Sequence, residues 1–522
     1  MENAKIQENM LWPPMNFISW KMAEHSAWYS GSSEVLANFY SNYMNAHLPA
    51  KALREMSNDS SFWGRQLQNQ GEVFLHVPLA GDIAETSASL LFSEEPTIRI
   101  AEANVENAST NAKNTQQALL DALDDRTVQM FNKIYESAEA CSGIGGVYIK
   151  LAWDEEISKY PIPVVEQADY AIPEFKFGVL NAVTFWKVMR IEKDGSKTYR
   201  LLERYSKGLI EYTLYLGTSD RLGYAVPLES IEETEDLKDF IDLNVDALLA
   251  VYIPNIRPNR VDRGSNYGRS DYCGQEGLMD ALDETYSSWM KDIALAQAKV
   301  MIPEEFLQKT EKGFRYNLDQ MLYTKLDMDP TIEGNKITPQ QFAIRSVEFE
   351  QTSVNLMERI ISGAGYSPQS FGLRIEGRSE SGLALHIRER KSFVTKGKKE
   401  RYWKPAIQRL LELFMLVYRF ELRGNEVDPN LSPTVEFNDG VLNDRNETAN
   451  SLKLLADAQA ISVETRVRIL HPDWEEEQIL AEAERIKEEN MIGQMVDPTS
   501  LNADDYDDEG DDTDGDDDEG DE

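Results

Sequence analysis

Cysteine is scarce in this sequence, and the histidines do not group into a metal-binding spacing. Cys141 and Cys273 are the only cysteines among 522 residues, and they form no Cys-x-x-Cys pair. This scarcity argues against a disulfide framework and is typical of a reducing compartment. The histidines are His25, His47, His76, His386 and His471. None lies at His-x-x-x-His spacing or beside a cysteine, so we expect no metal site and no cofactor.

Long apolar runs are also missing. The longest one, near residues 410–420, is interrupted by Glu412 and Arg419, and it is shorter than the roughly 20 apolar residues that cross a bilayer. The first residues include Glu2 and Lys5 rather than the apolar core of a signal sequence. We therefore expect an intracellular protein with no membrane partner.

Sequence motifs for catalysis are absent as well. A phosphate-binding loop of the form G-x-x-x-x-G-K-[ST] does not occur, although Gly195-Ser196-Lys197-Thr198 resembles its end. That segment lacks the first glycine and lies in an expected hairpin turn rather than at the start of a helix. No G-x-S-x-G occurs for a serine nucleophile. The scattered acids leave a two-metal nuclease open, but we expect no catalytic residue and no enzyme.

Positive charge is in short supply. The net charge is −38, and the 14 acids between Asp504 and Glu522, with no base among them, leave residues 1–503 with a net −24. A block of like charges repels itself, so we expect residues 496–522 to be a disordered acidic tail. Phosphate affinity comes from clustered Lys and Arg. Charge alone therefore predicts no tight DNA binding.

One basic concentration stands against this background, in residues 374–404. It holds ten basic and four acidic residues, a net +6. One interpretation is a solvated helix face or a set of salt bridges to acidic neighbours, because isolated charge runs usually lie on a wet surface. The other is a ring of positive charge at one level of a DNA channel. The residues alone do not decide between the two.

The hydrophobic pattern predicts an α+β fold that is predominantly helical, with several domains. Short apolar runs separated by Asp-Gly and Lys-Gly turns predict an antiparallel meander within residues 176–255. Residues 256–275 read as a polar, irregular linker. Pro405 is expected to kink the longest helix. The expected helices are 32–47, 111–140, 276–299, 346–362 and 382–423, and two more helices are expected within 444–489.

Several segments, in order along the chain, are similar to one known family. They are Trp63 followed by HVPLAGDIAETSASLLFSEEPTI (76–98), SGIGGVYIKLAWD (142–154), GRSDYCGQEGLMDALDETYSSWMKDI (268–293), SPQSFGL (367–373) with SGLALHIRERKS (381–392), and ISVETRVRILHPDWEEEQ (461–478). With these segments the chain resembles the portal proteins of long-tailed bacteriophages that infect Gram-positive hosts. The match covers nearly the whole length, and 268–293 is its most specific part.

The resemblance implies the portal fold of wing, stem, clip and crown. The wing is expected at 1–265 with its meander, stem helices at 266–299 and 346–362, and a small α/β clip at 300–345. A tunnel loop follows at 363–381, then a long kinked helix at 382–423, a crown at 424–495 and the tail. The implied function is a ring-shaped channel, usually of twelve subunits, at one capsid vertex, for double-stranded DNA packaging and ejection.

The resemblance also assigns contact residues. For the DNA channel at the tunnel loop they are Ser367, Gln369, Ser370, Arg374 and Arg378. On the basic helix near the channel they are Arg388, Lys391, Lys396 and Lys398. For clip contacts to the terminase large subunit and later the head-to-tail adaptor they are Lys309, Lys312, Arg315 and Lys325. Further implied partners are the major capsid and scaffolding proteins, and the implied location is the virion, after assembly in the host cytoplasm.

The resemblance makes the acidic composition understandable. A conduit must contact DNA without holding it, and a basic lining would act as a brake on a polymer with one phosphate per roughly 1.7 Å. Two alternatives stay open. A packaging enzyme such as a terminase subunit would need the missing phosphate loop. A capsid-associated scaffolding protein would have no DNA channel, and scaffolds are hydrophobically sparse, whereas this chain has nine tryptophans.

Overall fold

The protein is described by a computed structural model. It covers residues 5–14, 16–42, 62–63, 74–100, 108–193, 195–296, 299–301, 308–310, 313–315, 338–340, 344–373, 382–437, 445–458, 460–471, 474 and 476–494. The chain divides into a large unit, Met1–Asn438, and a second unit, Asp439–Glu522. Among the described residues, no helix is both long and apolar enough to cross a membrane.

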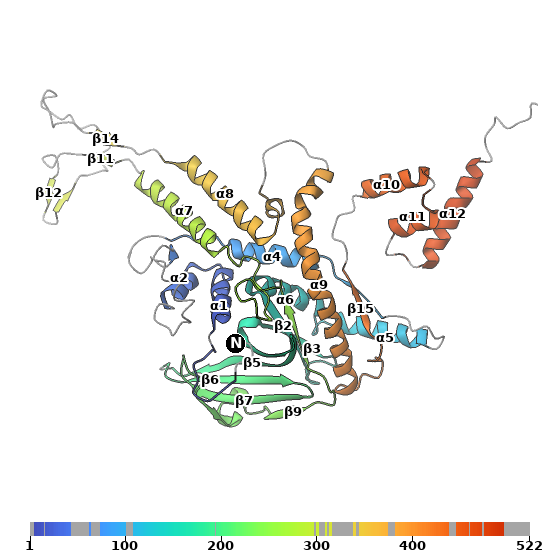
Figure 1. Cartoon of the computed structure of the whole chain (residues 1–522), viewed down its shortest axis with the longest axis horizontal. Helices are drawn as coiled ribbons and strands as arrows, with labels where there is room; N and C mark the ends of the chain where they lie inside the picture. Colours follow the sequence, from blue (N-terminus) through green and yellow to red (C-terminus); the bar gives the residue numbers. More distant parts are fainter. Residues whose placement is uncertain are drawn as a thin grey trace, which may run out of the picture. The chain divides into compact units, whose positions relative to one another are not determined.

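A helical layer occupies the centre of the first unit. Its helices are α1 (Phe17–Tyr29), α2 (Ser33–Asn42), α4 (Leu79–Phe92), α5 (Ala108–Leu123) and α6 (Met130–Ile144). Helix α4 packs along α6, and α1 contacts both. Figure 1 shows the largest sheet on one side of this layer and the helices α7 (Glu276–Leu295) and α8 (Ser346–Ala364) leaving it on the other.

The single helix expected over 111–140 is wrong, because α5 and α6 are separate helices. The side chain of Asp125 accepts a hydrogen bond from the backbone of Thr127 at 2.8 Å, and its carbonyl accepts from Val128 and Gln129. Gln129 then has a positive φ of 46°. Asp side chains compete with the helix for backbone donors in this way, and they favour turns.

A three-stranded antiparallel sheet follows α6. Its order is β10 (Ala250–Pro254), β2 (Gly146–Ala152) and β3 (Ile162–Gln167). Gly145 ends α6 with a φ of 106°, and a Cβ there would lie 2.9 Å from the backbone of Arg269. Only glycine fits both conditions. The Gly143-x-Gly145-Gly146 sequence is therefore a packed turn between a helix and a strand.

The expected meander is confirmed as a six-stranded antiparallel sheet. Its order is β4-β5-β6-β7-β8, with β9 also paired to β7. The bounds are β4 (Ala171–Lys176), β5 (Val179–Ile191), β6 (Thr198–Ser206), β7 (Leu209–Gly217), β8 (Tyr224–Val226) and β9 (Phe240–Asp242). The meander ends before the expected residue 255, because β10 pairs with β2 in the other sheet.

Residues 255–275 have no helix and no named strand, but they are not a solvated linker as expected. Asn255, Asn259, Tyr267, Asp271 and Tyr272 are all buried. The two asparagines bond carbonyls of the same segment, from Asn255 to Arg269 at 3.0 Å and from Asn259 to Gly268 at 2.9 Å. These polar side chains satisfy the buried backbone, so polarity here indicates internal hydrogen bonding.

Helices α7 and α8 pack against each other as a pair. Arg345 bonds Asp292 at 2.9 Å, and the rings of Trp289 and Phe349 are stacked 6.1 Å apart. Helix α7 ends four residues earlier than expected. The next strand, β11 (Lys299–Met301), pairs with β14 (Thr338–Gln340), and β12 (Gln308–Thr310) pairs with β13 (Gly313–Arg315). In the described parts of 300–345 the elements are strands.

The acidic face of α7 binds two earlier segments of the chain. Asp283 accepts hydrogen bonds from the Trp63 indole at 3.0 Å, the His76 ring at 2.8 Å and the Val77 backbone at 2.8 Å. Asp280 accepts from the backbone of Phe62 and of Trp63. Segment 76–98 is thus hydrogen-bonded to segment 268–293, which contains most of α7. Both segments carry the family resemblance.

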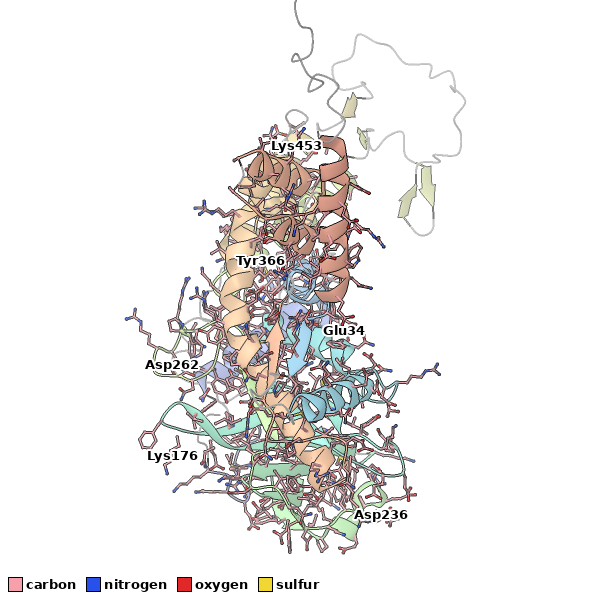
Figure 2. The ribbon with its side chains drawn as sticks, turned by 90° about the vertical axis from the view of Figure 1, so that its right-hand side faces the viewer. Glu34, Lys176, Asp236, Asp262, Tyr366 and Lys453 are labelled. Atoms are coloured by element: carbon pink, nitrogen blue, oxygen red, sulfur yellow. The ribbon has the colours of Figure 1, made fainter. Side chains whose placement is uncertain are left out.

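The long helix α9 (Gly382–Phe420) is confirmed, with Pro405 inside it. Figures 1 and 2 show its axis bending part-way along. Its second half enters the largest core through Trp403, Ile407 and Phe414. The strand β15 (Pro433–Glu436) then pairs with β1 (Thr97–Ile100). The crown was expected to begin at residue 424. Residues 424–437 belong instead to the first unit, which ends at Asn438.

The second unit has three helices in its described residues, where two were expected. They are α10 (Arg445–Asp457), α11 (Val463–Leu470) and α12 (Glu476–Gln494). Ser462 caps α11 by accepting a hydrogen bond from Thr465 at 3.2 Å. A small core of Val467, Ile479 and Ala483 joins α11 to α12. The expected disordered tail at 496–522 lies outside the described residues.

Candidate functional site

The base of the expected tunnel loop is fixed to the first half of α9. After α8, residues Pro368–Phe371 form a short 3-10 turn, η7. The backbone of Ser367 donates to the hydroxyl of Ser392 at 2.9 Å, and the hydroxyls of Ser370 and Ser392 are 2.9 Å apart. One turn further, the Thr395 hydroxyl donates to the Gly365 carbonyl at 2.6 Å. The chain that enters the loop is therefore held by the helix that leaves it.

These bonds change the role of the expected DNA-contacting serines. Ser367 is buried, and both serines bind Ser392, so they anchor the loop and are not presented to a ligand. Gln369 is half-buried, and its Oε1 has no hydrogen-bond partner among the described residues. Arg374 and Arg378 lie outside the described residues.

The basic segment divides between two faces of α9. Lys396 is buried and lies 3.7 Å from Glu400, so its expected place at a channel surface is wrong for the single chain. Lys391 is exposed, and its ammonium bonds the carbonyl of Ser362. Lys398 is exposed. The side chain of Arg388 lies outside the described residues. The exposed basic residues among the described side chains of this helix are Arg390, Lys391, Lys398, Arg401, Lys404 and Arg409.

The expected clip residues are only partly described. Lys309 lies in β12 and Arg315 in β13, where Lys309 is paired with Phe314 and Gln308 with Arg315. Lys312 and Lys325 lie outside the described residues. The structure thus places two of these four residues on one hairpin.

The most strongly bonded group below the loop was not expected from the sequence. Asp271 and Lys399 form an ion pair of 2.5 Å with almost no exposure of either side chain. The same carboxylate oxygen accepts from Ser142 at 2.6 Å and Tyr366 at 2.7 Å, and the other oxygen accepts from Asn255 at 2.8 Å. We refer to these residues as the Asp271 cluster.

The Asp271 cluster connects distant parts of the first unit. Ser142 is on α6, Tyr366 follows α8, and Lys399 is on α9 and also bonds Ser87 of α4. Burial alone would raise the pKa of Asp271, but the Lys399 charge and the hydrogen bonds outweigh it and hold the pKa below its ordinary value. The carboxylate is therefore charged and fully partnered, and it fixes α9 beside the loop base.

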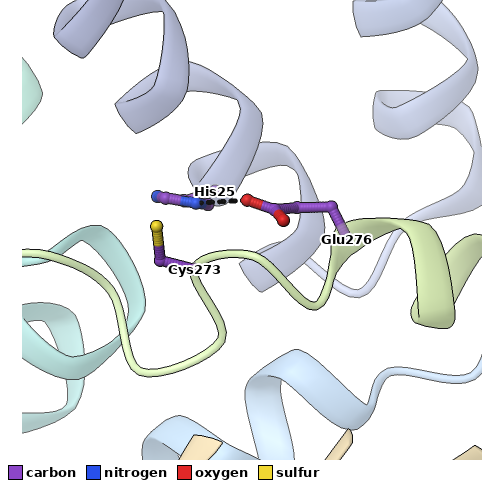
Figure 3. A group of neighbouring side chains, drawn as sticks. All are labelled: His25, Cys273 and Glu276. Atoms are coloured by element: carbon purple, nitrogen blue, oxygen red, sulfur yellow. Dashed lines mark hydrogen bonds and ion pairs between the residues drawn. The ribbon is translucent and has the colours of Figure 1, made fainter. Parts of the chain in front are cut away.

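A second buried group joins α1 to the start of α7 (Figure 3). His25 and Glu276 are 2.9 Å apart, and Lys21 lies 3.6 Å from the same oxygen of Glu276. His25, Cys273 and Glu276 have donor atoms within 4.8 Å of one another, a spacing compatible with a metal. However, the positive charge of Lys21 beside Glu276 opposes a bound cation. The arrangement is better suited to an internal ion pair.

The pKa of His25 is shifted by these neighbours. Burial lowers it, but the hydrogen bonds to Cys273 and Glu276 outweigh burial and raise the pKa to about 9. Burial would raise the pKa of Glu276, and His25 and Lys21 lower it instead. Glu24 also faces this group, through its 2.7 Å pair with Lys21. His25 is therefore a charged link between the two helices near neutral pH.

Comparisons with known proteins were made for the sequence and for the fold. A family model described as "Phage portal protein, SPP1 Gp6-like" matches residues 36–492. No curated protein matches the sequence. One similar solved chain is from the "Neck of empty GTA particle computed with C6 symmetry", with a TM-score of 0.42 and 12% identity over 75% of this chain and 88% of that one.

Two further solved chains are similar at comparable identity. A chain of the "Virion of native gene transfer agent (GTA) particle" has a TM-score of 0.38 and 11% identity, over 89% of this chain and 96% of that one. A chain of the "Neck of native GTA particle computed with C12 symmetry" has a TM-score of 0.36 and 12% identity, over 75% and 90%.

The Asp271 cluster generates a stability prediction. Lys399→Met leaves a buried carboxylate without its counter-charge, which we expect to lower the free energy of unfolding by about 3–5 kcal/mol. The double variant Asp271→Asn with Lys399→Met removes both charges, and we expect it to lower the free energy of unfolding by less than Lys399→Met alone. Urea unfolding followed by tryptophan fluorescence measures both. The control is Lys398→Met, one residue away and exposed, and a Lys399→Met variant as stable as this control would contradict the role.

His25 generates a pH prediction. Its folded-state pKa of about 9 lies above the ordinary histidine value of 6.5. The stabilisation is therefore complete below about pH 6.5 and is lost as pH rises through about 9, and it amounts to about 3 kcal/mol. We expect His25→Gln to remove this part of the pH dependence of unfolding, measured with Cys273 kept in place because its contact with His25 helps to raise the pKa. His471→Gln is the control, and equal pH profiles for the two variants would refute the assignment.

Proposed function

Because this chain belongs to the SPP1 Gp6-like family of phage portal proteins, we propose that it assembles into a closed ring of twelve subunits whose central channel carries double-stranded DNA. The observation that carries the proposal is the family match over residues 36–492, which runs from α2 into α12. A portal protein is a channel component of the virus particle. Ring size, DNA contact and position in the virion are the proposed parts.

The paired helices α7 and α8 are the proposed stem. They are antiparallel neighbours in one unit, and the segment between them, 296–345, begins at the end of α7 and returns at the start of α8. Chain connectivity therefore puts β11–β14 at the far end of the pair, where a clip would meet the terminase large subunit and later the head-to-tail adaptor. The wing is the sheet-bearing body, and the crown is the second unit, from 439.

The proposed DNA contact is the loop between η7 and α9. Its entry is bonded to Ser392 and Thr395, and its exit helix is held by Lys399. Arg374 and Arg378 belong to this loop by sequence, and the exposed Lys398 and Arg401 of α9 are basic residues further along the chain.

The acidic composition supports sliding. Residues 1–503 carry a net −24, so phosphates meet few cations on this protein. Affinity for DNA rises with the number of phosphates neutralised, and a chain with few such contacts allows DNA to pass. The proposed location is the capsid vertex of the virion, after assembly in the host cytoplasm, with the major capsid and scaffolding proteins as neighbours. A scaffolding role without a channel is not favoured, because the first unit has a large buried core.

Ring formation is the first test of the proposal. Purified protein is expected to form rings with a central hole in negative-stain electron microscopy, and mass photometry is expected to give twelve times the 59.4 kDa chain. A ring with a different number of subunits would change the proposed number of twelve and leave the proposed channel in place. A particle without a central hole at any protein or salt concentration would refute the channel.

Weak DNA binding is the second test. Fluorescence anisotropy with a 30-base-pair duplex is expected to give a Kd above about 1 μM at physiological salt, with affinity falling steeply as salt increases. Replacing Arg374 and Arg378 together by serine is expected to weaken binding further and to flatten the salt dependence. The matched control replaces Lys193 and Lys197, two exposed lysines of the β5–β6 hairpin, and is expected to bind as the wild type. Nanomolar binding at physiological salt would refute sliding.

A further inference from the structure

The tip of the β4–β5 hairpin is unusually apolar for an exposed turn. Phe177 is 96% exposed and Val179 68% exposed. Lys176, the last residue of β4, is also exposed and pairs across the hairpin with Val179. A phenyl ring almost wholly in water gains nothing from the fold of its own chain. The tip therefore presents an aromatic knob with a positive charge beside it.

The backbone of this turn argues that the phenyl ring is kept for another purpose. Phe177 and Gly178 are the two residues between the strands, and their φ values are 55° and 79°. Two-residue hairpin turns with positive φ at both positions favour Asn, Asp or Gly at the first one, because bulky side chains are strained there. A strained, exposed aromatic residue points to a contact outside the chain.

A cavity lined by apolar and acidic side chains lies at the other edge of the same sheet. Strands β8 and β9 both pair with β7, but with different parts of it, Leu214–Leu216 and Leu209–Glu211. Between them a cavity of about 520 Å³ opens, and its apolar lining residues include Leu209, Leu214, Leu228 and Phe240. Asp239 and Asp242 also line it.

The acidic residues that line the cavity complement the knob. A third acid of the cavity, Glu211, is already paired with Arg204 at 2.9 Å. Asp239 and Asp242 are exposed and form no ion pair with any basic residue in the described part of the chain. The knob thus carries one cation beside an aromatic ring, and the cavity carries, beside apolar side chains, two acids without an ion pair among the described residues. Such complementarity fixes the register of an interface and excludes wrong partners.

The two features lie on opposite sides of the subunit. The sheet order puts β4 at one edge and β8 with β9 at the other. Figure 2 shows Lys176 and Asp236, which lies three residues before Asp239, on opposite flanks of the molecule. A closed cyclic ring requires two different, complementary patches on opposite sides of each subunit, because every contact is head-to-tail. A knob and a cavity at the two edges of one sheet meet this requirement.

We propose that Phe177 of one subunit enters the β7–β8–β9 cavity of the next subunit, where Lys176 pairs with Asp239 and Asp242. The occupant is a second copy of this chain, and the inference rests on the proposed ring. The contact repeats at each interface of the ring. Even a modest binding free energy per interface therefore adds up to a large stabilisation of the closed ring. It also covers the part of the β7 edge that neither β8 nor β9 pairs with.

The decisive variant is Phe177→Asn. Asn is favoured at this turn position, so the monomer is expected to fold as well as the wild type, with an unchanged or higher Tm, while the knob is lost. We expect the protein concentration for half-maximal ring formation, measured by mass photometry, to rise at least tenfold. The matched control is Ile191→Asn at the other end of β5, where the side chain is 61% exposed, and it is expected to assemble as the wild type.

Two further experiments locate the partner of the knob. Lys176→Glu is expected to impair assembly, and adding Asp239→Lys with Asp242→Lys is expected to restore it. Phe177→Cys combined with Phe240→Cys is expected to give a ladder of disulfide-linked multimers on a non-reducing gel, above the background of the native Cys141 and Cys273. If wild-type rings form but Phe177→Asn assembles equally well and no ladder appears, this contact is refuted and the ring stands. If wild-type protein forms no ring, the proposed function itself fails.

Discussion

The buried ion pair between Asp271 and Lys399 is the constraint on which the placement of α9 depends. A charge inside a protein is tolerated only when other groups satisfy it, because taking it out of water costs several kcal/mol. Asp271 meets that condition with donors from α6, from Tyr366 just after α8 and from α9 itself, together with Asn255 of its own segment. Moving any of these elements would take a hydrogen bond, or in the case of α9 the counter-charge, from a buried carboxylate. The long helix is thus held in place near its middle by electrostatics and at its second half by the apolar core.

This fixed helix also anchors the base of the loop. Ser392 and Thr395 lie about two turns and one turn before Lys399, on the part of α9 that bonds the loop entry. The entry to the loop is therefore bonded to the helix that follows the loop. Ser367 and Ser370, which were first expected to contact DNA, make anchoring bonds to Ser392 instead.

Periodicity and turn chemistry predicted the elements that make few demands on tertiary context. The meander, the paired helices and the long helix follow from apolar spacing and from Gly-containing turns. Prediction failed where polar residues act inside the protein. Residues 255–275 read as a linker because Asn, Ser and Asp are usually exposed, yet here they bond one another and the backbone. The break at Asp125 and the pairing of β15 with β1 depend on hydrogen bonds that a hydrophobic pattern does not contain. The aromatic residues Trp63 and His76 marked a family segment, but only the fold reveals that Asp283 binds them.

The same limitation applies to charge. The sequence suggested a net +6 over residues 374–404, which reads as a strong positive surface. Lys396 and Lys399 are buried and paired with carboxylates, so part of that positive charge is neutralised by ion pairs inside the first unit. What remains on α9 is a set of exposed cations on one face, surrounded by a body that is acidic as a whole. Phosphate binding scales with cations that reach solvent and not with cations in the sequence. The folded chain is therefore a weaker DNA partner than its most basic segment suggests, which is the property that a channel for moving DNA requires.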